Sequence, residues 1–420
     1  MISLRIDADK CNGCVKCMHA CPTRALRVRD GTAVILDDYC IDCGECVTAC
    51  EKNAIVPLID TFEDFFQKFK FKIALPSPVL YSQFGGTVQP NDILAAIRSL
   101  GFGCVVDEAY ICEMVSSVIK HYADKNKSGF PYISSMCPVV TRLIQMRFHD
   151  LIHAIIPLQS PREITAQELK RKYSKKLGLP EEDIGVLYIT PCSAKINAIK
   201  DPPARKKSTI DAAMAIKDMY MRIANKLFTI RDSITEDDEM YMRASGLGIS
   251  WGMVGGEIAN FDHSECIAVS GIRDVIKILE DIDRGRFSNL RYLELRACRE
   301  GCLGGNLNVE DRYVARMNLI RLVDMFGSTP KFDREKLMRT HQSYFSFEKE
   351  PSPIRETEAP LNRRRDTAIE MLNRVIEIHG SLKQIDCGAC GSPDCATFAE
   401  DVVREYSTLD QCVFIGRDKK

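Results

Sequence analysis

The chain has 420 residues, a length that suggests two to four domains with substantial cores. Its 45% apolar and 27% charged residues are ordinary for a globular protein, and a net charge of −1 favours neither nucleic acid nor an anionic membrane as a partner. Nineteen cysteines, most of them at CxxC spacing, exclude a small secreted disulfide scaffold and indicate metal binding in a reducing compartment. Because we see no apolar leader and no run approaching the roughly 18 apolar residues of a membrane span, we expect a cytoplasmic protein.

Residues 1–56 repeat one four-cysteine motif. Cys11, Cys14, Cys17 and Cys21 form the first run, and Cys40, Cys43, Cys46 and Cys50 repeat its spacing. In such runs three thiolates bind one 4Fe-4S cube and the fourth crosses to the other, so we expect Cys50 to complete the first set and Cys21 the second. Residues 26–36 alternate around an Asp-Gly pair, which predicts a hairpin. We predict an α+β domain of the bacterial ferredoxin type; structural zinc is the alternative, which the repeated triple spacing disfavours.

Residues 57–345 change to an α/β pattern. Strand-like apolar runs alternate with helical patterns; the strands are expected at 71–75, 185–189 and 266–270, and the helices at 91–100, 108–122 and 274–283. This alternation predicts mostly parallel sheets covered by helices. Four more cysteines, Cys137, Cys192, Cys298 and Cys302, fall near strand ends, where α/β folds usually place their sites.

Residues 346–420 form the third predicted domain. Prolines and charges at 346–363 predict a linker, and apolar residues at three- and four-residue steps predict an amphipathic helix over 366–379. The motif that follows, Cys387, Cys390, Cys395 and Cys412, resembles the small four-cysteine iron-sulfur domain of electron-transfer proteins. We expect a 4Fe-4S cluster here, with zinc as the alternative. The remaining cysteines, Cys104, Cys112 and Cys266, are expected to behave as small core residues.

The central cysteines lie in three segments, 135–138, 190–195 and 297–305. In this order, and together with residues 74–78, 84–86 and 251–257, they resemble the signature stretches of iron-only (FeFe) hydrogenases. That family holds the H-cluster, a 4Fe-4S cube joined through one cysteine to a diiron unit with carbonyl and cyanide ligands. The resemblance implies that Cys137, Cys192, Cys298 and Cys302 bind the cube, and that Cys302 also bridges to the diiron unit.

The resemblance also implies roles for residues around the diiron unit. Lys195 would donate a charge-assisted hydrogen bond to an anionic cyanide ligand. Ser77, which follows Pro76 in the loop that resembles the pocket lining, would meet the other cyanide. Gly301 would let the backbone approach the metal closely.

Several positions depart from the catalytic members of that family. Met136 stands where they have a proton-donating cysteine, and a thioether cannot donate a proton. Thr190 and Arg296 stand where many members have methionines, and Arg162 stands where they have a glutamine; either arginine could instead be a surface charge. The upstream helix places Met114 and Ser117 where catalytic members have two glutamates of the proton path.

These departures, with the C-terminal cysteine domain, resemble the sensory branch of the family. We expect slow, reversible H2 oxidation and proton reduction, with the redox state passed through the flanking clusters to a redox partner protein. The resemblance implies maturation proteins that insert the diiron unit. Two alternatives remain: a catalytic hydrogenase subunit of a larger complex, and an iron-sulfur carrier or scaffold without the diiron unit. We expect no nicotinamide site, because no glycine-rich segment stands between a strand and a helix as that motif requires.

Overall fold

The chain folds into two compact units in the computed structural model. One unit takes the chain up to Leu58 together with the chain from Pro353 onward, and the other takes Ile59–Ser352. The structure describes residues 3–125, 131–202, 207–230, 243–262, 264–330, 332–333, 335, 337 and 365–415. The three-part division at residues 56 and 345 stays a prediction, and the expected linker at 346–363 lies outside the described residues.

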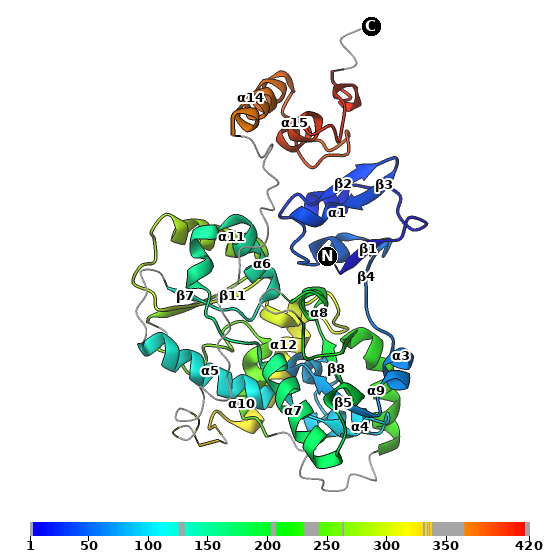
Figure 1. Ribbon diagram of the computed structural model, residues 1–420, viewed down its shortest axis with the longest axis vertical. Helices are drawn as coiled ribbons and strands as arrows, with labels where there is room; N and C mark the ends of the chain where they lie inside the picture. The colour runs from blue at the N-terminus through cyan, green and yellow to red at the C-terminus, as the bar shows by residue number, and fades with distance from the viewer. Residues whose placement is uncertain are drawn as a thin grey trace. The chain divides into compact units, whose positions relative to one another are not determined.

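The first part of the smaller unit has two antiparallel strand pairs and two short α-helices (Figure 1). The strands are β1 (Leu4–Ile6), β2 (Leu26–Arg29), β3 (Thr32–Ile35) and β4 (Ile55–Pro57), and the helices are α1 (Lys16–Ala20) and α2 (Glu45–Ala49). Strand β1 pairs with β4, and β2 pairs with β3 across the turn at Asp30 and Gly31. Both turn residues have positive φ, 49° and 75°, which confirms the predicted Asp-Gly hairpin.

The C-terminal part of the smaller unit is helical. It contains α14 (Arg365–Ser381), α15 (Cys395–Val403) and the short helix η7 (Leu409–Gln411). The helix expected over 366–379 is confirmed by α14. Its Ile378 packs with Leu382 and with Phe398 and Ala399 of α15 in a small apolar cluster.

The larger unit is built on two parallel sheets (Figure 1), which confirms the predicted α/β class. One has the order β6-β5-β8-β9, from Cys104–Val105, Phe71–Pro76, Ile184–Thr190 and Ala212–Ala215; the other has the order β10-β11-β7, from Cys266–Ser270, Tyr292–Arg296 and Tyr132–Ile133. The three strands expected from the sequence correspond to β5, β8 and β10.

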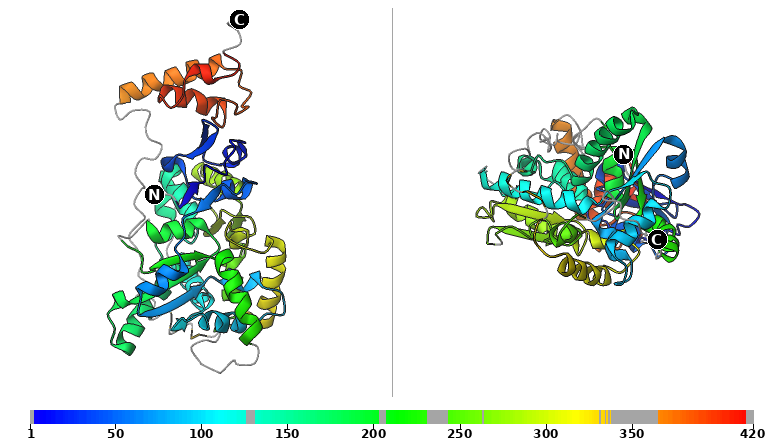
Figure 2. Two further views of the ribbon diagram at one scale, coloured as in Figure 1. Left: turned by 90° about the vertical axis from the view of Figure 1, so that its right-hand side faces the viewer. Right: turned by 90° about the horizontal axis from the view of Figure 1, so that it is seen from below.

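Helices cover both faces of the β5/β8 sheet, as Figure 2 shows from two further directions. Ala74 and Leu187 point into a core shared with α4 (Pro90–Arg98), α9 (Ile216–Ile230) and α12 (Arg312–Phe326). Ile73 and Val186, one residue earlier in each strand, point to the opposite face, toward α7 (Pro161–Leu177) and α8 (Ser193–Lys200). The alternation follows from the two-residue period of a strand, and it explains why both strands are apolar throughout.

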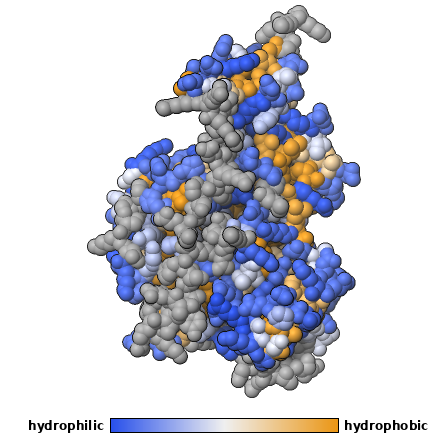
Figure 3. All heavy atoms as spheres, in the orientation of Figure 1, coloured by the Kyte–Doolittle hydropathy of each residue, from blue (hydrophilic) through white to orange (hydrophobic). Residues whose placement is uncertain are grey.

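The remaining helices of the larger unit complete its covering layers. They are α3 (Phe62–Lys68), α5 (Glu108–Lys125), α6 (Pro138–Arg147), α10 (Gly246–Ile249) and α11 (Ile272–Asp283), with the short helices η2 (Pro78–Gln83), η3 (His149–Ala154), η4 (Glu181–Asp183), η5 (Ser250–Gly252) and η6 (Gly301–Gly304). The helices expected at 91–100, 108–122 and 274–283 correspond to α4, α5 and α11. No helix in the described ranges has the length and apolar character that a membrane crossing requires. The face in Figure 3 mixes hydrophilic surface with separate hydrophobic patches.

Candidate metal centre

Three strand ends carry the central cysteines. Cys137 is the residue before α6 and follows β7, Cys192 is the residue before α8 and follows β8, and Cys298 and Cys302 follow β11. Strand β5 likewise ends at Pro76, directly before Ser77. These strands are parallel within their sheets. The loops that carry the cysteines and Ser77 therefore all start at the carboxyl ends of strands, where α/β folds usually place their sites.

Electrostatic interactions place three of these thiols together. Burial raises the pKa of Cys192 to about 11, and negative charge on Cys137 and Cys302 adds to the rise. Lys195 Nζ lies 3.8 Å from Cys302 Sγ. Burial alone would lower the pKa of Lys195, but Cys302, Tyr188 and Glu108 together raise it well above its usual value. Lys195 is therefore a fixed positive charge beside the sulfur of Cys302.

The loop that carries Cys298 and Cys302 is folded tightly against its neighbours. Gly301 has φ 71°, and a Cβ there would lie 2.7 Å from the backbone nitrogen of Val254. At Gly305, a Cβ would lie 2.3 Å from the carbonyl oxygen of Pro191, next to Cys192. Only glycine permits these approaches, so the glycines bring two cysteine loops into contact.

A cavity adjoins Cys302 and has a cationic wall. It has about 350 Å³ of empty space, open solvent at its mouth included, and is lined by Ser77, Pro78, Val79, Glu108, Cys112, Met136, Pro161, Arg162, Lys195, Trp251, Gly252, Arg296 and Cys302. Arg162 and Arg296 are only 7% and 3% exposed, so the alternative that they are surface charges is wrong. The Nε of Arg162 is buried and has no hydrogen-bond partner among the described residues. Lys195 and Arg162 outnumber Glu108, the one carboxylate among the described lining residues, and Arg162 keeps a donor with no partner in the described ranges. These features fit an anionic guest.

A buried ion network supports one side of this cavity. Arg296 donates from Nη2 to Glu257 Oε2 at 2.8 Å and from Nε to Glu294 Oε1 at 3.1 Å. Ser134 Oγ also donates to Glu257, and the backbone N–H of Met136 donates to that same hydroxyl. Because burial is incompletely offset by one guanidinium shared between two carboxylates, the pKa of Glu257 is raised to about 7.

Two further titratable side chains reach the cavity from α5. Glu108 and Cys112 lie one turn apart on the same helix face and are 4% and 2% exposed. Glu108 accepts a hydrogen bond of 3.0 Å from the hydroxyl of Tyr188, and burial raises its pKa against the effect of Lys195 and Arg162. Burial also raises the pKa of the Cys112 thiol well above its usual value. Cys112 belongs to a buried apolar cluster, which confirms the prediction that it is a core residue. The sequence did not predict that it also lines the cavity.

The positions expected to continue a proton path on α5 do not line the cavity. Ser117 donates to the carbonyl oxygen of Glu113, while Met114 packs against the apolar cluster around Val115. The chain thus presents Glu108 and Cys112 to the cavity, rather than the two expected positions. A helical pattern alone could not distinguish these faces, since both are largely buried.

In the smaller unit, the first ferredoxin-type cysteine set lines one cavity. Cys11, Cys14, Cys17 and Cys50 surround it, in the combination expected from the crossed fourth ligand. Burial, with the charge of the other three thiols, raises the pKa of Cys17 to about 11. Backbone N–H groups point at two of the sulfurs, from Ala33 to Cys11 at 3.4 Å and from Ala54 to Cys50 at 3.3 Å. Buried thiols with backbone donors fit a metal cluster, which takes thiolates and is tuned by such hydrogen bonds.

The second set is likewise joined by mutual charge effects. Burial raises the pKa of Cys43 well above its usual value, and Cys21, Cys46 and Cys40 contribute to that rise. The backbone N–H of Ala25 donates to Cys21 Sγ at 3.2 Å, and that of Asp42 donates to Cys40 Sγ at 3.4 Å. This set also contains the fourth cysteine of the other run.

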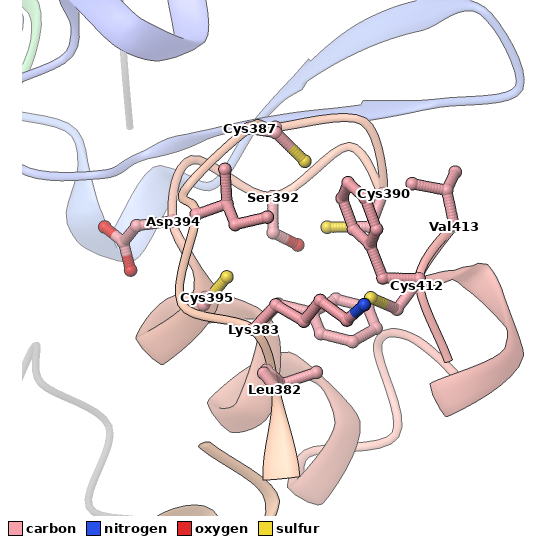
Figure 4. Close-up of a pocket in the computed structure, with 13 residues that line it drawn as sticks. Leu382, Lys383, Cys387, Cys390, Ser392, Asp394, Cys395, Cys412 and Val413 are labelled. Atoms are coloured by element: carbon pink, nitrogen blue, oxygen red, sulfur yellow. The ribbon is translucent and has the colours of Figure 1, made fainter. Parts of the chain in front are cut away.

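The C-terminal cysteines surround a third cavity in the smaller unit. The sulfurs of Cys387, Cys390, Cys395 and Cys412 gather around a common space in Figure 4. Asp386 holds the loop by accepting a 2.7 Å hydrogen bond from the backbone N–H of Cys395. Within the described ranges, no three His, Cys, Asp or Glu residues lie close enough to hold a single metal ion.

Comparison with known proteins finds three family models that match parts of the chain. The family described as "Iron only hydrogenase large subunit, C-terminal domain" matches residues 70–264, a 4Fe-4S dicluster domain matches residues 3–51, and an Fe-S cluster domain matches residues 382–414. Together these matches support a protein of the iron-only hydrogenase family.

The individual relatives cover different shares of the chain. The chain is 27% identical to the NADP-reducing hydrogenase subunit HndD of Solidesulfovibrio fructosivorans over 45% of its own length and 38% of that protein. It is 22% identical to iron hydrogenase 1 of Clostridium pasteurianum over 82% of its own length and 73% of that protein. A ferredoxin from Methanothermococcus thermolithotrophicus is 39% identical over 13% of this chain and 93% of its own length. Among solved structures, HydA1 of Chlamydomonas reinhardtii gives a TM-score of 0.47 at 14% identity, over 70% of this chain and 93% of that one.

The residues predicted from the hydrogenase resemblance separate into two groups. Ser77, Met136, Arg162, Lys195, Arg296 and Cys302 line the cavity. Thr190 instead accepts a hydrogen bond from the backbone N–H of Cys192 at 3.3 Å, while Pro76 ends β5 and Gly301 packs against the Val254 loop. The second group thus supports the loops that carry the first.

Proposed function

We propose that the chain carries an H-cluster and catalyses slow, reversible H2 oxidation and proton reduction, with a sensory role. The observation that carries this proposal is the cationic cavity beside Cys302. Cys137, Cys192, Cys298 and Cys302 would hold the cube, and Cys302 would bridge to the diiron unit. When bound, that unit supplies the cleavage of H2 and stores the electrons.

The cavity side chains would bind and orient the anionic ligands of the diiron unit. Lys195 is charged and 3.8 Å from Cys302, so it can donate to a cyanide held beside that sulfur. The unpartnered Nε of Arg162 offers a second donor in the same wall. An ordinary cube would need neither donor, and this supports the diiron unit over a carrier or scaffold that lacks it.

Slow turnover is expected because the described residues that line the cavity include no side chain that readily donates a proton. Met136 is 3% exposed and presents a thioether where a proton donor would serve the reaction. The acids that line the cavity, Cys112 and Glu108, both have raised pKa values because they are buried. Groups that hold their protons tightly transfer them slowly, and general acid–base catalysis is typically worth about 10²–10⁴-fold.

Electrons would pass through the ferredoxin-type clusters to a partner. The two thiol sets of the smaller unit fit two cubes, and such clusters carry single electrons. A redox partner protein would then receive the signal, and maturation proteins would supply the diiron unit. A cytoplasmic location remains part of this proposal.

Infrared spectroscopy tests the proposal directly. Purified chain, treated with a synthetic diiron unit, is expected to show carbonyl and cyanide bands and weak H2 turnover. Lys195→Met should shift the cyanide bands, because it removes the donor, whereas Lys200→Met leaves the cavity unchanged and should not. Absence of carbonyl and cyanide bands would leave a plain iron-sulfur carrier, and turnover as fast as that of efficient hydrogenases would exclude the sensory role.

One comparison favours a second candidate function. The relative HndD is named as a subunit of an NADP-reducing hydrogenase, and this chain spans 38% of its length. We therefore keep a catalytic subunit of a larger complex as the alternative. It predicts high turnover once partner subunits are added, with the nucleotide bound by those partners.

A further inference from the structure

The C-terminal cysteine domain is joined to the ferredoxin fold within the smaller unit by backbone contact. The N–H of Val28 in β2 donates to the carbonyl oxygen of Gly391 at 2.9 Å. Arg29 Nη1 donates to the same oxygen at 2.7 Å and to the carbonyl of Cys390 at 3.3 Å. Gly391 has φ 77°, and a Cβ there would lie 1.9 Å from the carbonyl oxygen of Val28. The loop of cluster ligands thus lies directly on β2.

A buried charge network fixes this contact. Asp401 of α15 accepts two hydrogen bonds from Arg27, from Nε at 2.5 Å and from Nη2 at 2.8 Å. Arg29 and Ser392 donate to the same carboxylate, at 3.1 and 2.6 Å. The side chains of Arg27 and Asp401 are 7% and 2% exposed. A bidentate pair buried to this degree has a definite geometry, and removing one partner leaves an unpaired charge in the interface.

The contact brings two thiol sets close to each other. The side chain of Val28 lines the cavity of Cys11, Cys14, Cys17 and Cys50, and its N–H meets the residue after Cys390. On the other side of the C-terminal loop, a Cβ on Gly388 would lie 2.9 Å from Cε of Met18 and 3.0 Å from Nε2 of His19. Met18 follows Cys17, and Gly388 follows Cys387. Two separate contacts therefore link the same two sets of ligands.

We propose that the C-terminal four-cysteine site is a fixed electron-transfer partner of the Cys11 cluster, held in place by the Arg27–Asp401 pair. One cube loses one electron and the other gains it, with no bond made or broken. Strand β2 and the loop of Cys387 and Cys390 would lie between the two cubes, and electron tunnelling is faster over shorter separations. Electrons would thus reach or leave the ferredoxin clusters at this end of the chain. The inference rests on the iron-sulfur part of the proposed function and not on the diiron unit.

Electron paramagnetic resonance on the full chain tests the inference. Chain without a diiron unit, fully reduced, is expected to show spin–spin broadening that involves the C-terminal cluster. In Arg27→Met this broadening should fall while the iron content stays the same, because the substitution leaves the C-terminal ligands intact. Lys16→Met is the matched control, since Lys16 forms an exposed pair with Glu51 in the same domain.

A second variant tests the same inference without changing the contact between Arg27 and Asp401. Cys387→Ser combined with Cys390→Ser removes the C-terminal cluster, and the signals of the two ferredoxin clusters should then sharpen. Unchanged linewidths of the ferredoxin clusters in this variant would overturn the inference. Missing carbonyl and cyanide bands after diiron treatment would count against the proposed function alone, because this experiment uses no diiron unit.

Discussion

At the scale of single residues, Met136 is the substitution with the clearest chemical consequence. Its side chain lines the cavity, and its backbone is held by Ser134. Met136→Cys introduces a thiol at the same point and is expected to raise H2 turnover by about 10²–10⁴-fold, the usual contribution of a positioned proton donor. Turnover with an artificial electron acceptor, on chain loaded with a diiron unit, measures the change.

Met136→Ala is the matched control, because it shortens the same side chain without adding an acid. An equal gain in both variants would assign the effect to space rather than to the thiol. No gain in either would show that protons reach the cavity elsewhere. In that case Glu108→Gln should lower turnover, since Glu108 is the carboxylate in the cavity wall.

Glu257 predicts a pH dependence of stability. Its pKa rises from 4.5 to about 7, first because of burial and then because Glu294 competes for Arg296. A carboxyl with a raised pKa binds its proton more tightly when folded, so its contribution is fully present below pH 4.5 and is lost as pH rises through about 7. The loss is on the order of 3 kcal/mol at 1.36 kcal/mol per pKa unit, shared with the coupled Glu294.

Urea unfolding between pH 4.5 and 8 measures this dependence. Glu257→Gln should flatten the profile, because the amide does not titrate in this range. Glu63→Gln is the control, since Glu63 lies in an exposed pair with Arg222 and its pKa is lowered. An unaltered slope in the Glu257 variant would mean that other buried acids set the profile.

At the scale of elements, α10 and η5 are tied to α5 through Glu113. Its carboxylate accepts hydrogen bonds from the backbone N–H and the hydroxyl of Ser245, each at 2.9 Å. Ser245 precedes α10, and η5 carries Trp251 and Gly252 to the cavity. Glu113 is therefore a positioning residue for one wall of the site.

Glu113→Ala is expected to destabilise the chain by about 1–3 kcal/mol, because it leaves two buried donors of Ser245 without an acceptor. Chemical denaturation measures the change in the free energy of unfolding. Glu280→Ala is the matched control: Glu280 pairs with Arg147 at the surface, where a salt bridge is worth about 0–1 kcal/mol. Equal losses in the two variants would contradict the role of Glu113.

The sequence predicts strands and turns well where the signal is local. Strand β5 and strand β8 are short apolar runs between helices, and the Asp-Gly turn at residue 30 requires the hairpin that is found. The position of Cys112 in the cavity depends instead on which face of α5 meets the loop of Lys195. Asp401 and Arg27 are 374 residues apart in sequence, and no local pattern around either residue predicts that they pair. Contacts set by tertiary packing leave no periodic trace in a single sequence.

At the scale of the whole molecule, the smaller unit joins both ends of the chain. The ferredoxin fold and the C-terminal cysteine domain share a buried ion pair, while the hydrogenase domain lies between them in sequence. The two ends therefore form one compact unit, which the proposed electron transfer would use as a single module. The metal content should therefore be measured on the full chain rather than on separate fragments.

The metal in the C-terminal site decides whether that module has two cubes or three. If all four cubes are present, reconstituted chain should contain about 16 irons before diiron treatment and about 18 after it, and no zinc. Cys395→Ser combined with Cys412→Ser should lower the iron content by about four, because each cube holds four irons. Cys266→Ser is the control: Cys266 is buried in an apolar cluster and should leave the count unchanged. Loss of one zinc, with iron unaltered, would assign the C-terminal site to zinc. It would also remove that site from the electron path, since zinc does not change its charge under these conditions.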